Sequence, residues 1–404
     1  MSEIWVPGRI EFLGKHTDYA GGRSLLCPVD RGIRLTAKPR TDSLVRVTDV
    51  TLGETVECEI SPDVKQPRGQ WANYPFTVVR RIARDFPDAR TGVDIEFTSD
   101  LPVAAGMSSS SALVVAVYMA VAAANELETK RAYRNNIHTP ENLAEYVGCI
   151  EGGFPFHGFA GDEGVGTLSG CEDQTAMICG RKGSLVRYSF CPVRFEDAYP
   201  IPTGQTFVIA ASGVLAEKTS AALEKYNSLS RKAAAAAEAW RRASGLNDKT
   251  LGDAIRKSDV ATVRGAIATT RVGGYTIDEL LVRFDQFHAE SEVIIPAVGE
   301  ALVRNDLVAL GELVDESQRG AERLLGNQIP ETIALASSAR ELGATAASAF
   351  GAGFGGSVWA MVSTRVAQDF LNAWRDSYLQ RFPKHASVAR FFATDAGGPA
   401  VRAA

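Results

Sequence analysis

A short segment near the N-terminus, Gly8 to Gly22, carries many polar side chains for its length. Its sequence GRIEFLGKHTDYAGG contains Arg9, Lys15, His16 and Asp18. A carboxylate accepts hydrogen bonds from hydroxyl groups, whereas Lys, Arg and His side chains donate them. The segment is therefore suited to bind a ligand with many hydroxyl groups. A polar turn with Arg9 in a surface salt bridge is the alternative.

A second segment, DLPVAAGMSSSSAL at residues 100–113, predicts a phosphate-binding loop. A strand ends at a proline, small residues follow, and several serines precede a long apolar helix. Backbone N–H groups at the start of a helix are unpaired, and small residues let a phosphate approach them closely. A serine hydroxyl can also bind Mg²⁺. A serine N-cap with solvated neighbours is the alternative.

Two further glycine patterns bear on nucleotide binding. The chain contains no GxxxxGK[ST] sequence, which excludes an ordinary P-loop. The sequence GAGFGG, Gly351 to Gly356, matches GxGxxG but follows a helix and precedes a strand, so we reject a dinucleotide-binding fold. We expect a loop that brings main chain close to a second ligand or loop.

Three acidic residues are candidates for chemistry. Glu172 and Asp173 lie in SGCEDQTA, and Glu151 precedes a glycine-rich span, Gly152 to Gly170, that we expect to be a loop. A carboxylate in a cleft can act as a general base, and a carboxylate can bind Mg²⁺. Solvated carboxylates are the alternative in each case.

Composition narrows the class of protein. The net charge of −5 and the pI near 5.7 argue against nucleic acid or a membrane surface as the main partner. No apolar run is long enough to span a membrane and no signal peptide is apparent, so we expect a cytoplasmic protein. Six cysteines without a CxxC pair predict reduced thiols and no Cys- or His-based metal site.

The order of strand-like and helix-like segments that position these residues predicts an α+β fold rather than a regular βαβ alternation. Residues 45–60 predict a hairpin, residues 92–102 a strand and residues 108–127 a helix. A break near residues 199–203 divides the chain into domains 1–203 and 204–404. The second half predicts four amphipathic helices before a strand, a helix and a last strand: Ala216–Ser244, Thr276–Asn305, Leu307–Leu325 and Pro330–Leu342.

Taken in order, these motifs resemble the galactokinase branch of the GHMP small-molecule kinases, from Pro7 to about Gly398. GRIEFLGKHTDYAGG resembles the galactokinase signature, LPVAAGMSSSSA the phosphate loop, and AFGAGFGGS the third, glycine-rich motif. WANYPFTVV and ESQRGAERLLGNQIPE are similar to further galactokinase segments. The resemblance implies a two-domain kinase that binds ATP and a monosaccharide in the interdomain cleft. It implies transfer of the γ-phosphoryl group to the sugar's anomeric hydroxyl, by a monomer or weak homo-oligomer.

The resemblance also implies roles for individual residues. By motif position, Asp173 resembles the catalytic base and Arg9 the cation beside it. Tyr226 falls where the family packs a tyrosine near the sugar. The remaining implied contacts are Lys15, His16, Asp18 and the Gly170 backbone for the sugar; Gly106, Met107, Ser108, Ser109 and Ser110 for the phosphates; and Ser110 with Glu151, or Glu145 in its place, for Mg²⁺.

Three departures from the family pattern leave alternatives open. Lys15 stands where galactokinases carry Glu, so it favours either neutral galactose or a C6-carboxylate sugar such as galacturonate, or it pairs with Glu11. The extra segment PFHGFAGDEG either covers the sugar site or decorates the surface. "CED" and "SAFG" replace the usual residues of two motifs, and we expect Glu172 to point away from Asp173. A non-catalytic sugar and ATP sensor is the rival function, which the intact serines disfavour.

Overall fold

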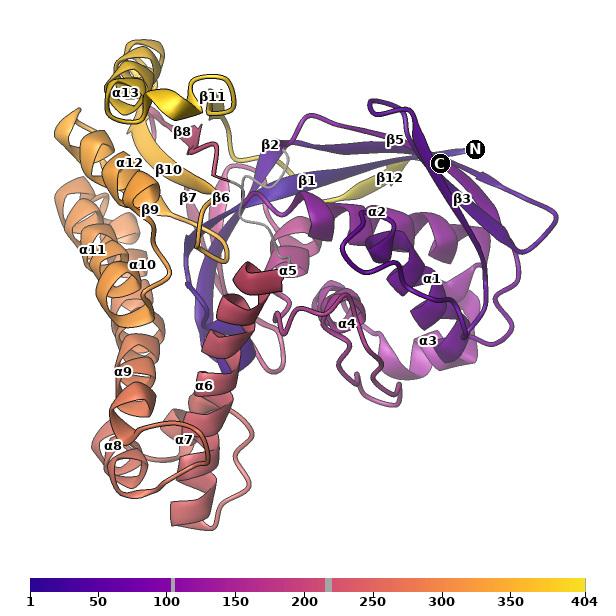
Figure 1. Ribbon diagram of the computed structural model, residues 1–404, viewed down its shortest axis with the longest axis horizontal. Helices are drawn as coiled ribbons and strands as arrows, with labels where there is room; N and C mark the ends of the chain where they lie inside the picture. Colours follow the sequence, from indigo (N-terminus) through magenta and orange to yellow (C-terminus); the bar gives the residue numbers. More distant parts are fainter. Residues whose placement is uncertain (103–105, 215–219, 404) are drawn as a thin grey trace.

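The computed structural model describes residues 1–102, 106–214 and 220–403, and two β-sheets form its framework (Figure 1). The strands span Ser2–Leu13 (β1), Arg23–Pro39 (β2), Leu44–Asp49 (β3), Glu54–Glu59 (β4), Val93–Ser99 (β5), Ser184–Ser189 (β6), Arg194–Pro200 (β7), Gln205–Ala211 (β8), Ala346–Ala349 (β9), Ser357–Ser363 (β10), Arg390–Thr394 (β11) and Val401–Ala403 (β12). The larger sheet has the order β12-β1-β2-β5-β3-β4, with β6 beside β2 and β7 beside β6. The smaller sheet has the order β11-β8-β10-β9.

Helices cover both sheets and form a separate arm. The α-helices span Asn73–Asp85 (α1), Ser109–Ala124 (α2), Arg131–Asn136 (α3), Pro140–Gly152 (α4), Glu172–Cys179 (α5), Ser220–Ser244 (α6), Leu251–Lys257 (α7), Val260–Thr269 (α8), Ile277–His288 (α9), Ile295–Arg304 (α10), Leu307–Gly320 (α11), Pro330–Glu341 (α12) and Ala367–Arg381 (α13). Short 3₁₀ segments are Asp18–Ala20 (η1), Leu127–Thr129 (η2) and Pro383–His385 (η5), and π-helical segments are Ala289–Ile294 (η3) and Ala321–Leu325 (η4). In the described residues no helix is both long and apolar enough to cross a membrane.

Helix α2 is buried against the larger sheet and its helices because it is apolar on every side. Val114, Val115 and Val117 are fully buried although they point in different directions around the helix. An all-round apolar helix needs neighbours on several sides, and α2 packs against β1, β2 and helices α1, α4 and α5. This packing fixes the serine-rich start of α2 beside the start of α5.

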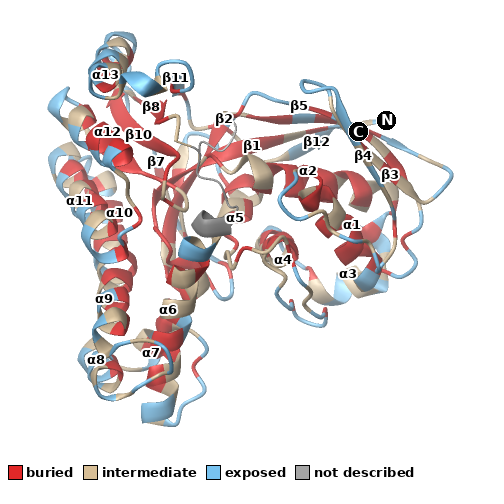
Figure 2. Cartoon of the chain, viewed as in Figure 1, coloured by how far each residue is buried: buried red, intermediate tan, exposed pale blue. Residues whose placement is uncertain are grey.

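Both faces of the smaller sheet are apolar, so the sheet packs against helices on one side and against strand β1 on the other. Successive strand residues point to opposite faces, so Val358 and Ala360 of β10 pack beneath α12 and α13. Trp359 points to the other face, where its ring stacks on Phe12 of β1 with centroids 4.2 Å apart. Strands β8 and β10 are accordingly buried along almost their whole length (Figure 2).

The helical arm has a core of its own. Helices α6, α7, α8 and α9 extend away from both sheets at the lower left of Figure 1. The alanine-rich stretch of α6 allows close helix packing, and Ala236 and Ala237 are buried against Phe284 and Phe287 of α9. The arm reaches the N-terminal segment through η1, whose Ala20 belongs to the same core.

The α+β class predicted from the sequence is confirmed, and its strands form two sheets. The predicted hairpin is β3–β4, and the predicted helix Thr276–Asn305 is α9, η3 and α10 in direct succession. Residues 216–219 of the predicted helix Ala216–Ser244 lie outside the described residues. The sequence did not reveal α7, α8 or β12. Because β12 pairs with β1 in the first sheet, the C-terminal residues return to the N-terminal half, and the division at residue 203 stays a prediction.

Candidate active site

An ion pair between Arg9 and Asp173 brings together residues 164 positions apart. Arg9 lies on β1 and Asp173 in the first turn of α5. Arg9 Nε and Nη2 both lie 2.6 Å from Asp173 Oδ1, and the Arg9 side chain is only 3% exposed. Burial disfavours the charged form of Arg9, but Asp173 and two further carboxylates outweigh it and raise the pKa of Arg9. Arg9 is therefore charged, and the two contacts fix the pair in place.

The serine-rich helix start contacts the other oxygen of the same carboxylate. Ser108 Oγ donates to Asp173 Oδ2 at 2.5 Å, and Ser111 Oγ donates to it at 3.1 Å. Ser108 precedes α2 in a left-handed conformation with φ of 57°, which turns its hydroxyl toward α5. Arg9 Nη1 also donates to the Gly106 carbonyl at 2.5 Å. The sequence motif did not predict that Ser108 and Ser111 hold the candidate base.

The glycine-rich motif lies close against the phosphate loop, with little space for a side chain between them. A Cβ on Gly351 would lie 3.1 Å from the Gly106 carbonyl oxygen, and one on Gly106 would lie 3.3 Å from the Phe350 carbonyl oxygen. Both glycines have positive φ, a conformation that side-chain-bearing residues rarely adopt. Residues 103–105 of the predicted phosphate loop lie outside the described residues.

The carboxylate of Asp18 lies directly against the backbone of Gly170. A Cβ on Gly170 would fall 2.1 Å from Asp18 Oδ2. The carboxylate accepts hydrogen bonds from the backbone N–H of Tyr19 at 2.8 Å and of Glu172 at 3.2 Å. Burial raises the pKa of Asp18 to about 6, so the group is mostly ionised at neutral pH. An ionised Asp18 is an acceptor for hydroxyl groups.

His16 is buried, neutral and held in one orientation. Its Nε2 lies 3.1 Å from the Ala352 carbonyl oxygen, which can only accept, so Nε2 carries the proton. Nδ1 then accepts from the Tyr19 hydroxyl at 2.8 Å. Burial, with nearby Arg283, lowers the pKa of His16 to about 3. The Tyr226 ring lies 5.1 Å from the imidazole, centroid to centroid, so the residues predicted to flank the sugar adjoin one another.

Arg283 of α9 supports this turn, and the sequence analysis missed it. Its Nη2 donates to the His16 carbonyl and its Nη1 donates to Gln286 Oε1 at 2.6 Å. The side chain is 2% exposed. A signal was present, because Arg283 falls on the face of α9 that also buries Leu280 and Phe287. A cation at a core position of a helical pattern needs a buried partner.

The amine of Lys15 lies against α11. Its side chain is 1% exposed, and Nζ donates to Ser317 Oγ at 3.1 Å. Ser317 Oγ in turn donates to Glu290 Oε1 at 3.0 Å, and that oxygen also accepts the Gly14 N–H at 2.9 Å. Among the described residues no ion pair links Lys15 to Glu11. This arrangement argues against a contact between the amine and the C6 group of a sugar.

Glu172 turns toward β1 and β2. Its Oε2 accepts from Ser24 Oγ at 3.0 Å, and its carboxyl group lies close to that of Glu11. Burial raises the pKa of Glu172 well above its usual range, and the neighbouring acidic groups Glu11, Asp18 and Asp173 raise it further. Glu172 therefore contacts a different set of groups from Asp173, as expected from the sequence.

The predicted Mg²⁺ ligand Glu151 is buried at the end of α4. Its Oε2 accepts from Gln174 Nε2 of α5 at 2.6 Å, and the residue is 1% exposed. Ser110 lies in the first turn of α2, which packs against α4. Both side chains offer oxygen, the ligand that Mg²⁺ prefers. No cluster of three or more His, Cys, Asp or Glu suited to a metal occurs in the part of the chain that the structure describes.

The extra segment between Glu151 and Asp173 packs into the helical layer of the first domain. Phe156 and Phe159 are buried, with ring centroids 5.5 and 5.3 Å from the Tyr146 ring of α4. Asp162 pairs with Arg80 of α1 at 3.1 Å. Through these contacts the segment packs as part of the fold. The alternatives drawn from the sequence were only a surface loop or a cover over the sugar site.

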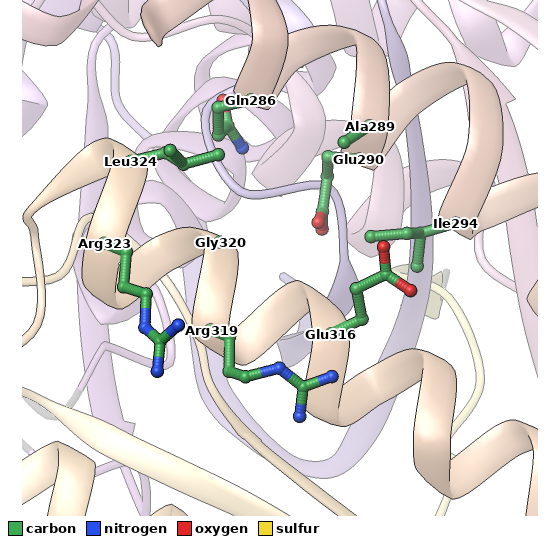
Figure 3. Close-up of a pocket in the computed structure, with 9 residues that line it drawn as sticks. All are labelled: Gln286, Ala289, Glu290, Ile294, Glu316, Arg319, Gly320, Arg323 and Leu324. Carbon is green, nitrogen blue, oxygen red and sulfur yellow. The ribbon is translucent and has the colours of Figure 1, made fainter.

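A separate pocket of about 240 Å³ opens between the helices that follow the arm (Figure 3). Its lining combines residues of α9, η3, α11 and η4, among them Glu290, Arg319 and Arg323. Of the described residues predicted to act on sugar or phosphate, none lines this pocket. The ion pair of Arg9 and Asp173 therefore lies outside this pocket.

Three family models match separate parts of the chain. The GHMP kinases N-terminal domain matches residues 73–157, and the GHMP kinases C-terminal domain matches residues 300–380. The galactokinase galactose-binding signature matches residues 4–39, which include the turn with His16 and Asp18. The three matches follow the order of the motifs in the sequence.

Named relatives cover nearly the whole chain. A galactokinase of Chloroflexus aggregans is 29% identical over 377 residues, 93% of this chain and 87% of the relative. One of Actinobacillus pleuropneumoniae serotype 5b is 26% identical over 377 residues, 93% of this chain and 88% of the relative. The fold is similar to that of Lactococcus lactis galactokinase solved with galactose, with a TM-score of 0.78, 22% identity and coverage of 99% of this chain and 94% of that one. Methanococcus jannaschii mevalonate kinase has a TM-score of 0.58 at 14% identity, covering 98% of both chains.

Proposed function

We propose that this chain, which belongs to the galactokinase branch of the GHMP kinase family, transfers the γ-phosphoryl group of ATP to the anomeric hydroxyl of galactose or a related monosaccharide. The observation that carries the proposal is the carboxylate of Asp173, which Arg9 holds at one oxygen and Ser108 at the other. These contacts join the sugar signature, the phosphate loop and α5 at one point. Phosphoryl transfer needs mainly positioning and charge neutralisation, and this junction provides both.

Asp173 serves as the general base. Its side chain is 15% exposed, so one face of the carboxylate stays open to a ligand. The carboxylate accepts the proton of the anomeric hydroxyl as the oxygen attacks the γ-phosphorus. The guanidinium of Arg9 keeps the carboxylate ionised and offsets negative charge near the transferred group.

The sugar lies against the turn that contains His16 and Asp18. Asp18 accepts hydroxyl hydrogens, and the backbone of Gly170 lies within contact of the same carboxylate. The Tyr226 ring beside His16 provides an apolar face for the C–H side of a pyranose. Neutral His16 holds this turn against the Ala352 carbonyl of the glycine-rich motif, which couples the sugar side of the site to the nucleotide side.

ATP phosphates bind the segment from Gly106 to Ser110, where unpaired N–H groups begin α2. Met107 and Ser109 offer backbone N–H groups, and Ser110 with Glu151 would hold the Mg²⁺ that accompanies ATP. That ion neutralises phosphate charge when bound. Cytoplasmic location and a monomeric or weakly associated state remain predictions from the sequence.

Two alternatives have specific consequences. A uronic acid kinase would require a cation at C6, whereas the amine of Lys15 donates to Ser317. A sugar and ATP sensor would not require an aligned base, whereas Asp173 has its partners in place. Both observations favour a catalyst for a neutral sugar.

The test is a coupled ADP-release assay with ATP, Mg²⁺ and a panel of neutral hexoses and uronic acids. We expect turnover with galactose or a close neutral relative, and we expect Asp173→Asn to lower kcat by about 10³-fold or more while ATP still binds. Sugar binding without turnover for every member of the panel would support the sensor. Near-normal turnover of Asp173→Asn would refute the role of Asp173.

A further inference from the structure

Two glutamates adjoin the ion pair of the proposed active site, Glu11 buried and Glu172 partly exposed. Glu11 follows Arg9 by two positions on β1, so both side chains point to the same face of the strand. Glu172 precedes Asp173 at the start of α5. Glu11 is 1% exposed, and the carboxyl group of Glu172 lies close enough to hydrogen-bond to it once one of the two carries a proton. Each glutamate is thus a sequence neighbour of one member of the ion pair.

Among the described carboxyl oxygens of Glu11 and Glu172, Glu11 Oε1 is the buried one that lacks a hydrogen-bond donor. Glu11 Oε2 accepts the Gly351 N–H at 3.0 Å, and Glu172 Oε2 accepts the Ser24 hydroxyl at 3.0 Å. Glu11 Oε1 is buried and has no N–H or O–H donor among the described residues. A carboxylate accepts hydrogen bonds only, so two carboxyl groups in contact need a proton on one of them. An O–H between Glu11 and Glu172 supplies the missing donor.

The charges around the pair agree with a single shared proton. Groups that interact electrostatically with the pair are the cations Arg9 and Lys15 and the anions Asp18 and Asp173. Burial raises the pKa of Glu11 to about 7, although Arg9 and Lys15 oppose the shift, and the pKa of Glu172 is raised well above its usual range. Two carboxylates that share a site do not both ionise near neutral pH.

The pair is linked to the other parts of the proposed site, namely the glycine-rich motif, the phosphate loop and Arg9. Glu11 holds the N–H of Gly351, the first glycine of the glycine-rich motif, which lies against Gly106 of the phosphate loop. Arg9 donates to the carbonyl of that same Gly106. A shift of Glu11 would therefore move the glycine-rich motif relative to the phosphate loop and to Arg9.

We propose that Glu11 and Glu172 are positioning residues that form an acid–carboxylate pair with one shared proton, and that this pair holds the glycine-rich motif and Arg9 in register with Asp173. The existence of the pair is argued from the contacts and does not depend on the proposed function. The effect of the pair on turnover rests on the proposed function. Loss of the shared proton at alkaline pH places two negative charges in contact. Their repulsion separates Glu11 from Glu172 and disturbs the alignment.

The decisive variants are Glu11→Gln and Glu172→Gln. A glutamine amide donates an N–H to the remaining carboxylate at every pH, and its carbonyl oxygen still accepts from Gly351 or Ser24. Each variant therefore reproduces the protonated pair permanently. Glu11→Met has similar size but neither donates nor accepts. Glu331→Gln is the matched control, because Glu331 is also buried but its partners His385 and Lys384 are basic.

The first measurement is independent of turnover. Infrared spectra at about pH 7.5 should show a protonated carboxyl band in the wild type that Glu11→Gln and Glu172→Gln both lose and Glu331→Gln retains. Loss in either folded glutamine variant supports the pair, so the test survives if one variant does not fold. A band that persists in both, or its absence from the wild type, overturns the proposal even if the chain phosphorylates sugar.

The second measurement is the pH profile of kcat with the preferred sugar. We expect kcat of the wild type to fall on the alkaline side, and the ratio of kcat at pH 9 to kcat at pH 7 to be about fivefold higher or more in Glu11→Gln. Glu11→Met should lower kcat across the whole range. An unchanged profile in Glu11→Gln refutes a positioning role for the pair. If every sugar fails, the infrared result still decides whether the pair exists.

Discussion

Replacement of Gly170 by alanine tests the sugar side of the site in isolation. A Cβ there would lie 2.1 Å from Asp18 Oδ2 and 2.4 Å from Asp18 Cγ. One of the two groups must move by about 1 Å to reach an ordinary contact. A displacement of that size at a positioned group costs about 10²-fold in rate, which corresponds to about 2.7 kcal/mol of transition-state stabilisation. We therefore expect kcat/KM for galactose to fall about 100-fold.

The assay is steady-state ADP release with galactose varied at saturating ATP and with ATP varied at saturating galactose. Because the Cβ meets Asp18 and not the phosphate loop, the affinity for ATP should change by less than about threefold. Gly273→Ala is the matched control, since a Cβ at Gly273 meets nothing within 4 Å and its φ is not positive. Thermal unfolding followed by circular dichroism identifies any general loss of structure.

A kcat/KM for galactose within about twofold of the wild type in a folded Gly170→Ala protein would refute the reasoning. It would mean either that Asp18 does not contact the sugar or that the segment before α5 moves freely. Asp18→Asn separates these two explanations, because it removes the charge without adding volume.

The remaining predictions concern charge and pH. Lys15→Met should leave the ratio of galactose to galacturonate turnover unchanged but destabilise the fold by roughly 1–3 kcal/mol, because the buried Ser317 hydroxyl, which donates to Glu290, loses the hydrogen bond from the amine, as urea unfolding would show; a changed ratio would restore Lys15 to the sugar site. Burial raises the pKa of Asp18 from 3.8 to about 6, so between these values the folded state holds a proton that the unfolded state releases. The contribution of Asp18 to the free energy of unfolding should therefore fall by on the order of 3 kcal/mol as the pH rises from 4 to 6, and Asp18→Asn should abolish that slope. A slope of opposite sign would contradict the burial of an ionisable Asp18.

The sequence predicted the fold well where local pattern and tertiary structure agree. The alternation around Gly53 predicts β3–β4, and the all-round apolar run after the serines predicts the buried helix α2. Helices α7 and α8 were missed because each is short. Strand β12 has only three paired residues and depends on a partner at the other end of the chain. No local pattern encodes such a pairing.

The candidate site was predictable as a set of motifs but not as a set of contacts. Motif positions indicated Arg9 and Asp173, whereas the hydrogen bond from Ser108 depends on a left-handed backbone conformation that no residue-type rule assigns to serine. The direction of Lys15 depends on Ser317, 302 positions away. The pairing of Glu11 with Glu172 likewise requires β1 and α5 to be placed first. Long-range packing decides these contacts, and a single sequence carries no direct record of it.

The pairing of β12 with β1 also has a consequence for how the chain reaches its native state. Residues Glu3, Ile4 and Trp5 pair with β2 along one edge of β1 and with Val401, Arg402 and Ala403 along the other. Until residues 401–403 are in place, that second edge of β1 presents unpaired backbone groups to any other extended segment. Contacts between such distant parts of a chain form slowly. Nascent chains are therefore expected to associate through this edge during translation, and shortening the C-terminus by a few residues would make that exposure permanent.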